Sequence, residues 1–120
     1  MFGFNKKIEI KKLEINEAYR NYKKNTDKIM IICVDEVVNF DNLHIEGAEC
    51  LPFRLLKRFD EYYPEKNIIY YIYSLNPALS EKAVKILTKM NYDSYDLGSF
   101  YDFHENIDGL NVPRKYRRKK

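Results

Sequence analysis

Two stretches of the chain are apolar at nearly every position, and they set the expected architecture. Residues 29–34 and 68–73 are rich in β-branched and aromatic side chains, which is typical of strands buried on both faces of a parallel sheet. Apolar residues repeat at helical spacing over residues 53–63 and 80–90, and Pro52 favours a helix start before the first of these segments. Strands that alternate with helices predict an α/β domain built from parallel β-α-β units.

Weaker patterns complete this prediction. Three more short strands are expected at residues 8–15, 49–51 and 94–97, which makes about five mainly parallel strands with helices on both faces. Asn16 is expected to cap a short helix, and Ser99 is expected to cap a final helix that Gly109 can stop. The residues after Asp35, up to about position 44, are interpreted as a polar loop.

The length of 120 residues suits one domain, here residues 1–110. No apolar run approaches the ~20 residues that a membrane span needs. The N-terminus lacks the order of basic, apolar and small-residue regions that marks a signal peptide, so we expect a cytoplasmic protein.

The chain has two cysteines, Cys33 and Cys50, which are too few for a disulfide framework and lack metal-ligand spacing. Cys33 lies inside a predicted strand and is interpreted as a buried core thiol. The sequence alone leaves a disulfide between the two open, with free thiols expected. We expect no metal ion and no other cofactor.

The basic charge is concentrated at the C-terminus. Residues 113–120 hold six of the 21 basic residues, which leaves 15 basic against 18 acidic residues in the rest of the chain. We therefore treat residues 111–120 as a basic tail, with Arg114, Lys115, Arg117 and Arg118 as candidate binding residues. Such a tail is a solvated chain end or a segment that binds nucleic acid or another acidic surface. Attachment to a membrane surface is disfavoured, because no lipidation motif or amphipathic helix lies beside it.

Asp35 and Ser74 follow the two central strands directly. In a parallel sheet the carboxyl ends of the strands meet at one edge, which is where ligands bind. Ser74 also precedes a loop that opens on a helix, and free backbone N–H groups at a helix N-terminus can cradle an anion. The sequence therefore predicts a site at this edge, with a hydroxyl at its centre.

Four segments in order resemble the small single-domain rhodanese-like proteins over about residues 8–110. Asp35 matches the aspartate that begins the family's Asp-Val-Arg segment, and His44-Ile-Glu-Gly-Ala with Pro52 resembles its His-Ile-Pro-Gly-Ala…Pro motif. Residues 73–80, Tyr-Ser-Leu-Asn-Pro-Ala-Leu-Ser, overlay the active loop, and residues 91–98 resemble the closing segment that ends in Leu-Gly-Gly. The resemblance implies a three-layer rhodanese-like sandwich.

The departures from this family lie in the chemistry. In active members a loop cysteine holds sulfane sulfur as a persulfide, and the resemblance places Ser74 where that cysteine would stand. Leu75 and Leu79 replace positions that are often polar or cationic, Pro77 lacks a backbone N–H, and Val37 replaces the arginine. The six residues from Ser74 to Leu79 match the sulfurtransferase loop length and are one short of the dual-specificity phosphatase loop.

The resemblance therefore implies a vestigial active-site loop with no catalytic residue, formed by Ser74, Leu75, Asn76, Pro77, Ala78, Leu79 and Ser80 beside the strand-end Asp35. The leading interpretation is a catalytically inactive binding or regulatory module, with Leu75 and Leu79 contacting an unidentified protein or small ligand. One alternative is a sulfurtransferase-type enzyme that handles sulfane sulfur through Cys50, and another is a nucleic-acid-associated protein that uses its tail. His44 is expected to have a packing role, and His104 to lie solvated on the last helix.

Overall fold

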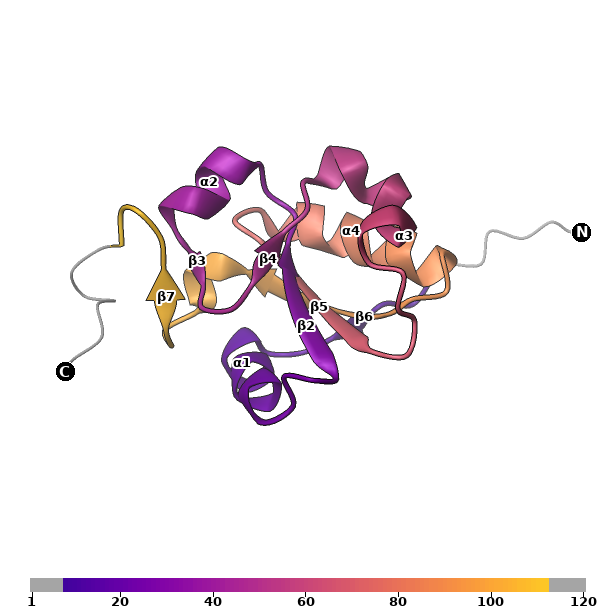
Figure 1. The fold of residues 1–120 in the computed structure, drawn as a ribbon, viewed down its shortest axis with the longest axis horizontal. Coiled ribbons are helices and arrows are strands. Elements are labelled where there is room, and N and C mark those ends of the chain that lie inside the picture. The colour runs from indigo at the N-terminus through magenta and orange to yellow at the C-terminus, as the bar shows by residue number, and fades with distance from the viewer. Residues whose placement is uncertain (1–7, 113–120) are drawn as a thin grey trace, which may run out of the picture.

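The computed structural model describes residues 8–112 and contains a five-stranded sheet between layers of helices (Figure 1). The strands of this sheet are β1 (Lys11–Lys12), β2 (Ile29–Cys33), β4 (Glu49–Cys50), β5 (Ile69–Ser74) and β6 (Asp93–Ser99). They are arranged in the order β1-β6-β5-β2-β4, and every neighbouring pair is parallel. The predicted α/β sandwich with five mainly parallel strands is therefore confirmed.

Helices cover both faces of this sheet. One face carries α1 (Ile15–Lys24), and the other carries α4 (Pro77–Lys89) with the 3-10 turn η1 (Phe53–Arg58) and α3 (Phe59–Tyr62) (Figure 1). The remaining elements are α2 (Val37–Asn42), η2 (Phe100–Asp102) and the antiparallel pair β3 (His44–Ile45) and β7 (Ile107–Asp108). None of the helices within residues 8–112 has the length and apolar character needed to cross a membrane.

Alternating side chains of the central strands feed two separate cores. Ile31 and Tyr71 face the core under α1, whereas Ile32 and Ile72 face the core under α4. All four are at most 4% exposed. Because burying such a side chain stabilises a fold by about 1.5–3 kcal/mol, the continuous apolar runs are what make these two strands the centre of the sheet.

The predicted cap of α1 was wrong. Glu14, not Asn16, caps this helix, and its carboxylate accepts hydrogen bonds from the backbone N–H groups of Asn16 and Glu17. Asn16 is instead buried inside the first turn, where its amide donates to the carbonyl oxygen of Asp102 and accepts from the N–H of His104. The first strand is also shorter than expected, because only Lys11 and Lys12 pair with β6.

Two segments after the central strands also differ from the prediction. The loop expected after Asp35 contains α2 and then β3, and β3 pairs with β7 near the end of the described chain. The final helix is only the short turn η2, which Ser99 caps as predicted by accepting from the N–H of Tyr101. His104 is exposed as expected, but it follows η2 and lies outside any helix. The proposed tail beyond residue 112 lies outside the described residues.

Candidate functional site

The carboxylate of Asp35 and the hydroxyl of Ser74 meet at the carboxyl edge of the sheet. The Ser74 Oγ donates a hydrogen bond of 2.5 Å to Asp35 Oδ1, and the backbone N–H of Leu75 donates one of 2.9 Å to Oδ2. Ser74 is fully buried and Asp35 is 9% exposed. The two strand-end residues therefore lie together as predicted, and they bind each other.

The Ser74 hydroxyl has a second role within the same loop. Its oxygen accepts a hydrogen bond of 2.9 Å from the backbone N–H of Asn76. The hydroxyl thus joins the end of β2, through Asp35, to the turn that leads into α4. A hydroxyl that donates to one group and accepts from another has little capacity left for a ligand.

The remaining N–H groups of the loop form hydrogen bonds within the first turn of α4. This helix begins at Pro77, earlier than the predicted start near Ser80, because Asn76 caps it and proline is favourable at the first helical position. The Asn76 side-chain oxygen accepts from the N–H of Ala78 at 3.0 Å, and its carbonyl oxygen accepts from Leu79 and Ser80.

The expected anion cradle has no free N–H groups left, because the protein itself supplies their acceptors. Every backbone N–H group from Leu75 to Ser80 has an acceptor inside the loop or on Asp35, and Pro77 contributes none. A cradle binds an anion through N–H groups that have no other partner. In this structure the carboxylate of Asp35 and the side chain of Asn76 occupy those positions.

Both cysteines contact Asp35. Cys33 donates from its thiol to Asp35 Oδ2 at 3.3 Å, and Cys50 donates to the Asp35 carbonyl oxygen at 3.2 Å. Burial, and after it the nearby carboxylate of Asp35, raises the pKa of the Cys33 thiol well above its ordinary value. The same two causes raise the pKa of Cys50 to about 11. Both cysteines are free thiols, and Cys33 is buried in the core as predicted.

The two leucines of the loop point into different cores. Leu75 packs against the core under α1, and Leu79 packs against the core under α4, so each is half-buried. The exposed tip of the loop consists of Asn76, Pro77 and Ala78. Leu75 and Leu79 therefore flank this tip rather than form one continuous apolar surface.

Two further sequence candidates have clear positions. Val37, which stands where the resembled family has an arginine, begins α2 and is 48% exposed. The ring of His44 stacks on Phe40, and its Nδ1 lies 2.7 Å from the Phe40 carbonyl oxygen, which fits the expected packing role.

The candidate tail residues Arg114, Lys115, Arg117 and Arg118 lie outside the described residues. Within residues 8–112, no three His, Cys, Asp or Glu side chains are grouped so that they could hold a metal ion.

A second buried carboxylate was missed from the sequence. Asp96 is 5% exposed, and its Oδ1 accepts from the Ser80 hydroxyl at 2.7 Å and from the N–H of Gly98 at 2.8 Å. The available signal was its place in the last strand, two residues after the buried Ser94. Residues two apart on a strand face the same side of the sheet, so Asp96 shares its face with Ser94.

Comparison with solved structures identifies this fold. The rhodanese from E. coli matches with a TM-score of 0.63 and 24% identity, over 68% of this chain and 99% of that chain. A rhodanese-like domain from Anabaena matches with a TM-score of 0.74 and 16% identity, over 91% of this chain and 86% of that one. A rhodanese-like domain protein from Staphylococcus aureus matches with a TM-score of 0.72 and 19% identity, over 84% and 99%.

Comparisons of sequence gave no further relative. No protein-family model matches the chain, and neither does any curated protein. Since the structural matches are below 25% identity, they establish the architecture only. This α/β chain has the fold of the rhodanese-like domains.

Proposed function

We propose that this chain is a catalytically silent rhodanese-like domain that works as a binding or regulatory module. The observation that carries the proposal is the position of Ser74, whose hydroxyl is buried and engaged by both Asp35 and Asn76. Sulfur transfer by this fold requires a thiolate that can hold a persulfide, and an alcohol cannot form one.

The surroundings of Ser74 support the same proposal. A sulfurtransferase loop lowers the pKa of its cysteine with free N–H groups and the helix dipole. Here the N–H groups already have acceptors, and a carboxylate lies where a persulfide or an anionic donor would need positive potential. This arrangement stabilises the loop itself, because it satisfies the buried polar groups of the loop.

A closed loop of this kind presents a fixed surface. Asn76, Pro77 and Ala78 form an exposed tip at the capped start of α4, between the half-buried Leu75 and Leu79. Rigid elements lose little conformational entropy when they bind. We propose this loop after β5 as the contact site for a protein or small ligand.

The sulfur-handling alternative through Cys50 gains no support from its surroundings. A thiol whose pKa is raised to about 11 is almost entirely protonated at neutral pH and is a poor nucleophile. No helix of the described chain has its N-terminus at Cys50, and its thiol donates to the carbonyl oxygen of Asp35. The binding proposal is therefore the one that the geometry favours.

The test is sulfur transfer from thiosulfate to cyanide, measured as thiocyanate formed by the purified chain. We expect no thiocyanate above a heat-denatured control, and we expect the Cys50 peptide to show no added sulfur mass after treatment with thiosulfate. The matched control is the Cys50→Ser variant, which should behave as the wild type does. Turnover by the wild type that disappears in Cys50→Ser would replace this proposal with the sulfur-handling alternative.

A further inference from the structure

The two cysteines of the chain occupy paired positions on neighbouring strands. Cys33 ends β2 and Cys50 ends β4, and the parallel register sets their Cα atoms opposite each other. Neighbouring strands of a sheet lie about 4.7–4.9 Å apart, and disulfides join residues whose Cα atoms are about 4.4–6.8 Å apart. The backbone therefore holds the two residues at a separation that a disulfide can span.

Both thiols also project from the same face of the sheet. Side chains alternate between the faces along a strand, and Cys33 faces the core under α1. The preceding register pair faces the other way, because Ile32 lies in the core under α4 and Glu49 accepts a hydrogen bond from Tyr63, which packs against that core. Cys50 follows Glu49 directly, so its thiol projects from the face that Cys33 occupies.

A shared contact brings both sulfur atoms to one residue. The Cys33 Sγ lies 3.3 Å from Asp35 Oδ2, and the Cys50 Sγ lies 3.2 Å from the Asp35 carbonyl oxygen. Burial first, and then the Asp35 carboxylate, raises the pKa of Cys33, and charge on Cys50 adds to this effect. The electrostatic coupling between the two thiols agrees with their paired positions.

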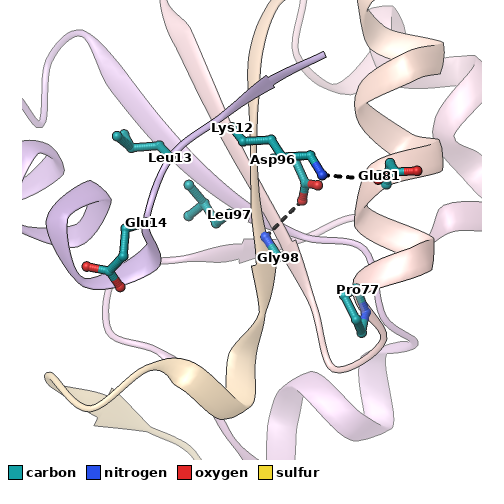
Figure 2. Close-up of a pocket in the computed structure, with 8 residues that line it drawn as sticks. All are labelled: Lys12, Leu13, Glu14, Pro77, Glu81, Asp96, Leu97 and Gly98. Atoms are coloured by element: carbon teal, nitrogen blue, oxygen red, sulfur yellow. Dashed lines mark hydrogen bonds and ion pairs between the residues drawn. The ribbon is translucent and has the colours of Figure 1, made fainter. Parts of the chain in front are cut away.

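An oxidant reaches this pair through Cys50. This residue is partly exposed and belongs to an edge strand of the sheet, whereas Cys33 is 2% exposed. Neither cysteine is among the residues that line the pocket of about 380 Å³ beside the start of α4, so that pocket offers no route to Cys33 (Figure 2). Cys50 is therefore the thiol that reacts first, and Cys33 is the thiol that completes the bond.

We propose that Cys33 and Cys50 form a reversible disulfide when a hydroperoxide is the oxidant. The Cys50 thiolate attacks one oxygen of hydrogen peroxide, the O–O bond breaks, and the departing hydroxide takes up the proton that Cys50 lost. The Cys33 sulfur then attacks the sulfur of the Cys50 sulfenic acid, the S–O bond breaks, and water leaves with the proton of Cys33. The two thiols lose two electrons, and the peroxide is reduced to two molecules of water.

The disulfide acts on the loop after β5. It removes both S–H donors from Asp35, whose carboxylate also accepts from the Leu75 N–H and the Ser74 hydroxyl. A carboxylate that loses one donor holds its remaining donors more strongly. The oxidation state of the cysteines therefore sets how tightly the loop is held. This regulation rests on the proposed function, which names the loop as a contact site, whereas the disulfide itself does not.

The experiment is treatment of the reduced, purified chain with hydrogen peroxide at pH 9, followed by mass spectrometry of the protein and of its unreduced peptides. Burial and then the carboxylates of Asp35, Asp41 and Glu36 raise the pKa of Cys50 to about 11, so little thiolate is present at pH 7. We expect a mass loss of about 2 Da, a peptide that links Cys33 to Cys50, and full reversal by dithiothreitol. The rate should rise about tenfold per pH unit from pH 7 to pH 9.

Matched variants test the order of the two steps. Cys33→Ala leaves Cys50 without a thiol to react with, so its sulfenic acid should accumulate and be trapped by dimedone. The wild type should give at least about tenfold less of this adduct, because the disulfide consumes the sulfenic acid. In Cys50→Ala the buried Cys33 should remain a thiol. The linked peptide of the wild type tests the pairing even where a variant fails to fold.

NMR of the ¹⁵N-labelled wild type tests the effect on the loop. The Leu75 amide is the reporter, because its N–H donates to the oxygen of Asp35 that also accepts from Cys33. Its signal should shift on oxidation and return with dithiothreitol. The control is the Asn91 amide, which precedes β6 at the opposite edge of the sheet and should keep its position.

Three results would overturn the disulfide: no peptide that links Cys33 to Cys50, links between two copies of the chain instead, or Cys50 oxidised to sulfinic acid beside an unreacted Cys33. An unshifted Leu75 amide in the oxidised protein would overturn the regulation of the loop. These outcomes are independent of sulfur transfer. Thiosulfate turnover would remove the proposed function and leave the disulfide, whereas a chain that shows neither would keep the proposed function and lose only the disulfide.

Discussion

The Ser74 hydroxyl donates a hydrogen bond of 2.5 Å to the Asp35 carboxylate, so the ends of two neighbouring strands are joined at the carboxyl edge of the sheet. Both side chains are buried, and the same carboxylate also accepts from the Leu75 N–H and the Cys33 thiol. The buried polar groups of this site therefore satisfy one another, and we expect the stability of the loop to depend on the serine.

Removal of this hydroxyl should destabilise the domain. In Ser74→Ala the Asn76 N–H and one oxygen of Asp35 lose their partner inside the protein, which we expect to lower the free energy of unfolding by about 2–4 kcal/mol. Urea denaturation measures this change. The control is Ser94→Ala, since the Ser94 hydroxyl is buried without a hydrogen-bond partner in the described chain, and its loss should change stability by no more than about 1 kcal/mol. Equal effects of the two substitutions would contradict the role given to Ser74.

A thiol introduced at position 74 should be unreactive. In Ser74→Cys the sulfur would stand beside the Asp35 carboxylate, which already helps to raise the pKa values of Cys33 and Cys50. We therefore expect the new thiol to have a pKa above the ordinary value near 8.5, and its alkylation by iodoacetamide to be slow at pH 7 and to accelerate with pH. Alkylation is measured in a Cys50→Ser background by mass spectrometry. Rapid modification at pH 7 would indicate an open, electropositive loop.

Stability should fall in acid through two glutamates that hold α1. The hydrogen bond from the Asn16 backbone lowers the pKa of Glu14, and the hydrogen bond from the Tyr19 hydroxyl lowers that of Glu46. A folded-state pKa below the unfolded value near 4.5 contributes stability above that pH, and this contribution is lost as pH falls through the folded-state values. The free energy of unfolding should therefore decline between about pH 5 and pH 3.

The double variant Glu14→Gln with Glu46→Gln tests this origin. Its unfolding free energy should depend less on pH over the same interval, because neither side chain can then gain a proton. Unfolding by urea at several pH values, with circular dichroism as the readout, gives both slopes. A variant with the slope of the wild type would assign the acid sensitivity to other carboxyl groups.

The layers of the fold were predictable because the signals that specify them are local. The segments that form β2 and β5 are apolar at nearly every position, which an exposed segment would not be. The two segments that end near Tyr63 and near Met90 repeat apolar residues at helical spacing, and each forms helical turns with one buried face. The strand-end positions of Asp35 and Ser74 followed from the topology alone. Their place at one edge needed only the rule that parallel strands end at one edge, whereas their hydrogen bond is known only from the structure.

The errors arose where a distant partner decides the structure. Asn16 is a favourable cap by type, but its hydrogen bonds to Asp102 and His104 draw it into the helix and leave the cap to Glu14. The pairing of β3 with β7 joins segments about 60 residues apart and has no local pattern. The sequence also did not indicate that the N–H groups of the loop after β5 already have acceptors, because only the structure shows that Asp35 accepts from the N–H of Leu75.

Sulfur transfer by Ser74→Cys, compared with the wild type, tests the closed loop most directly. If the loop has lost its free N–H groups, restoring the cysteine is insufficient, and both proteins should form no more thiocyanate from thiosulfate and cyanide than a denatured control. Clear turnover by Ser74→Cys would contradict this account, because it would mean that the loop still functions as an anion cradle and that only the sulfur atom was missing.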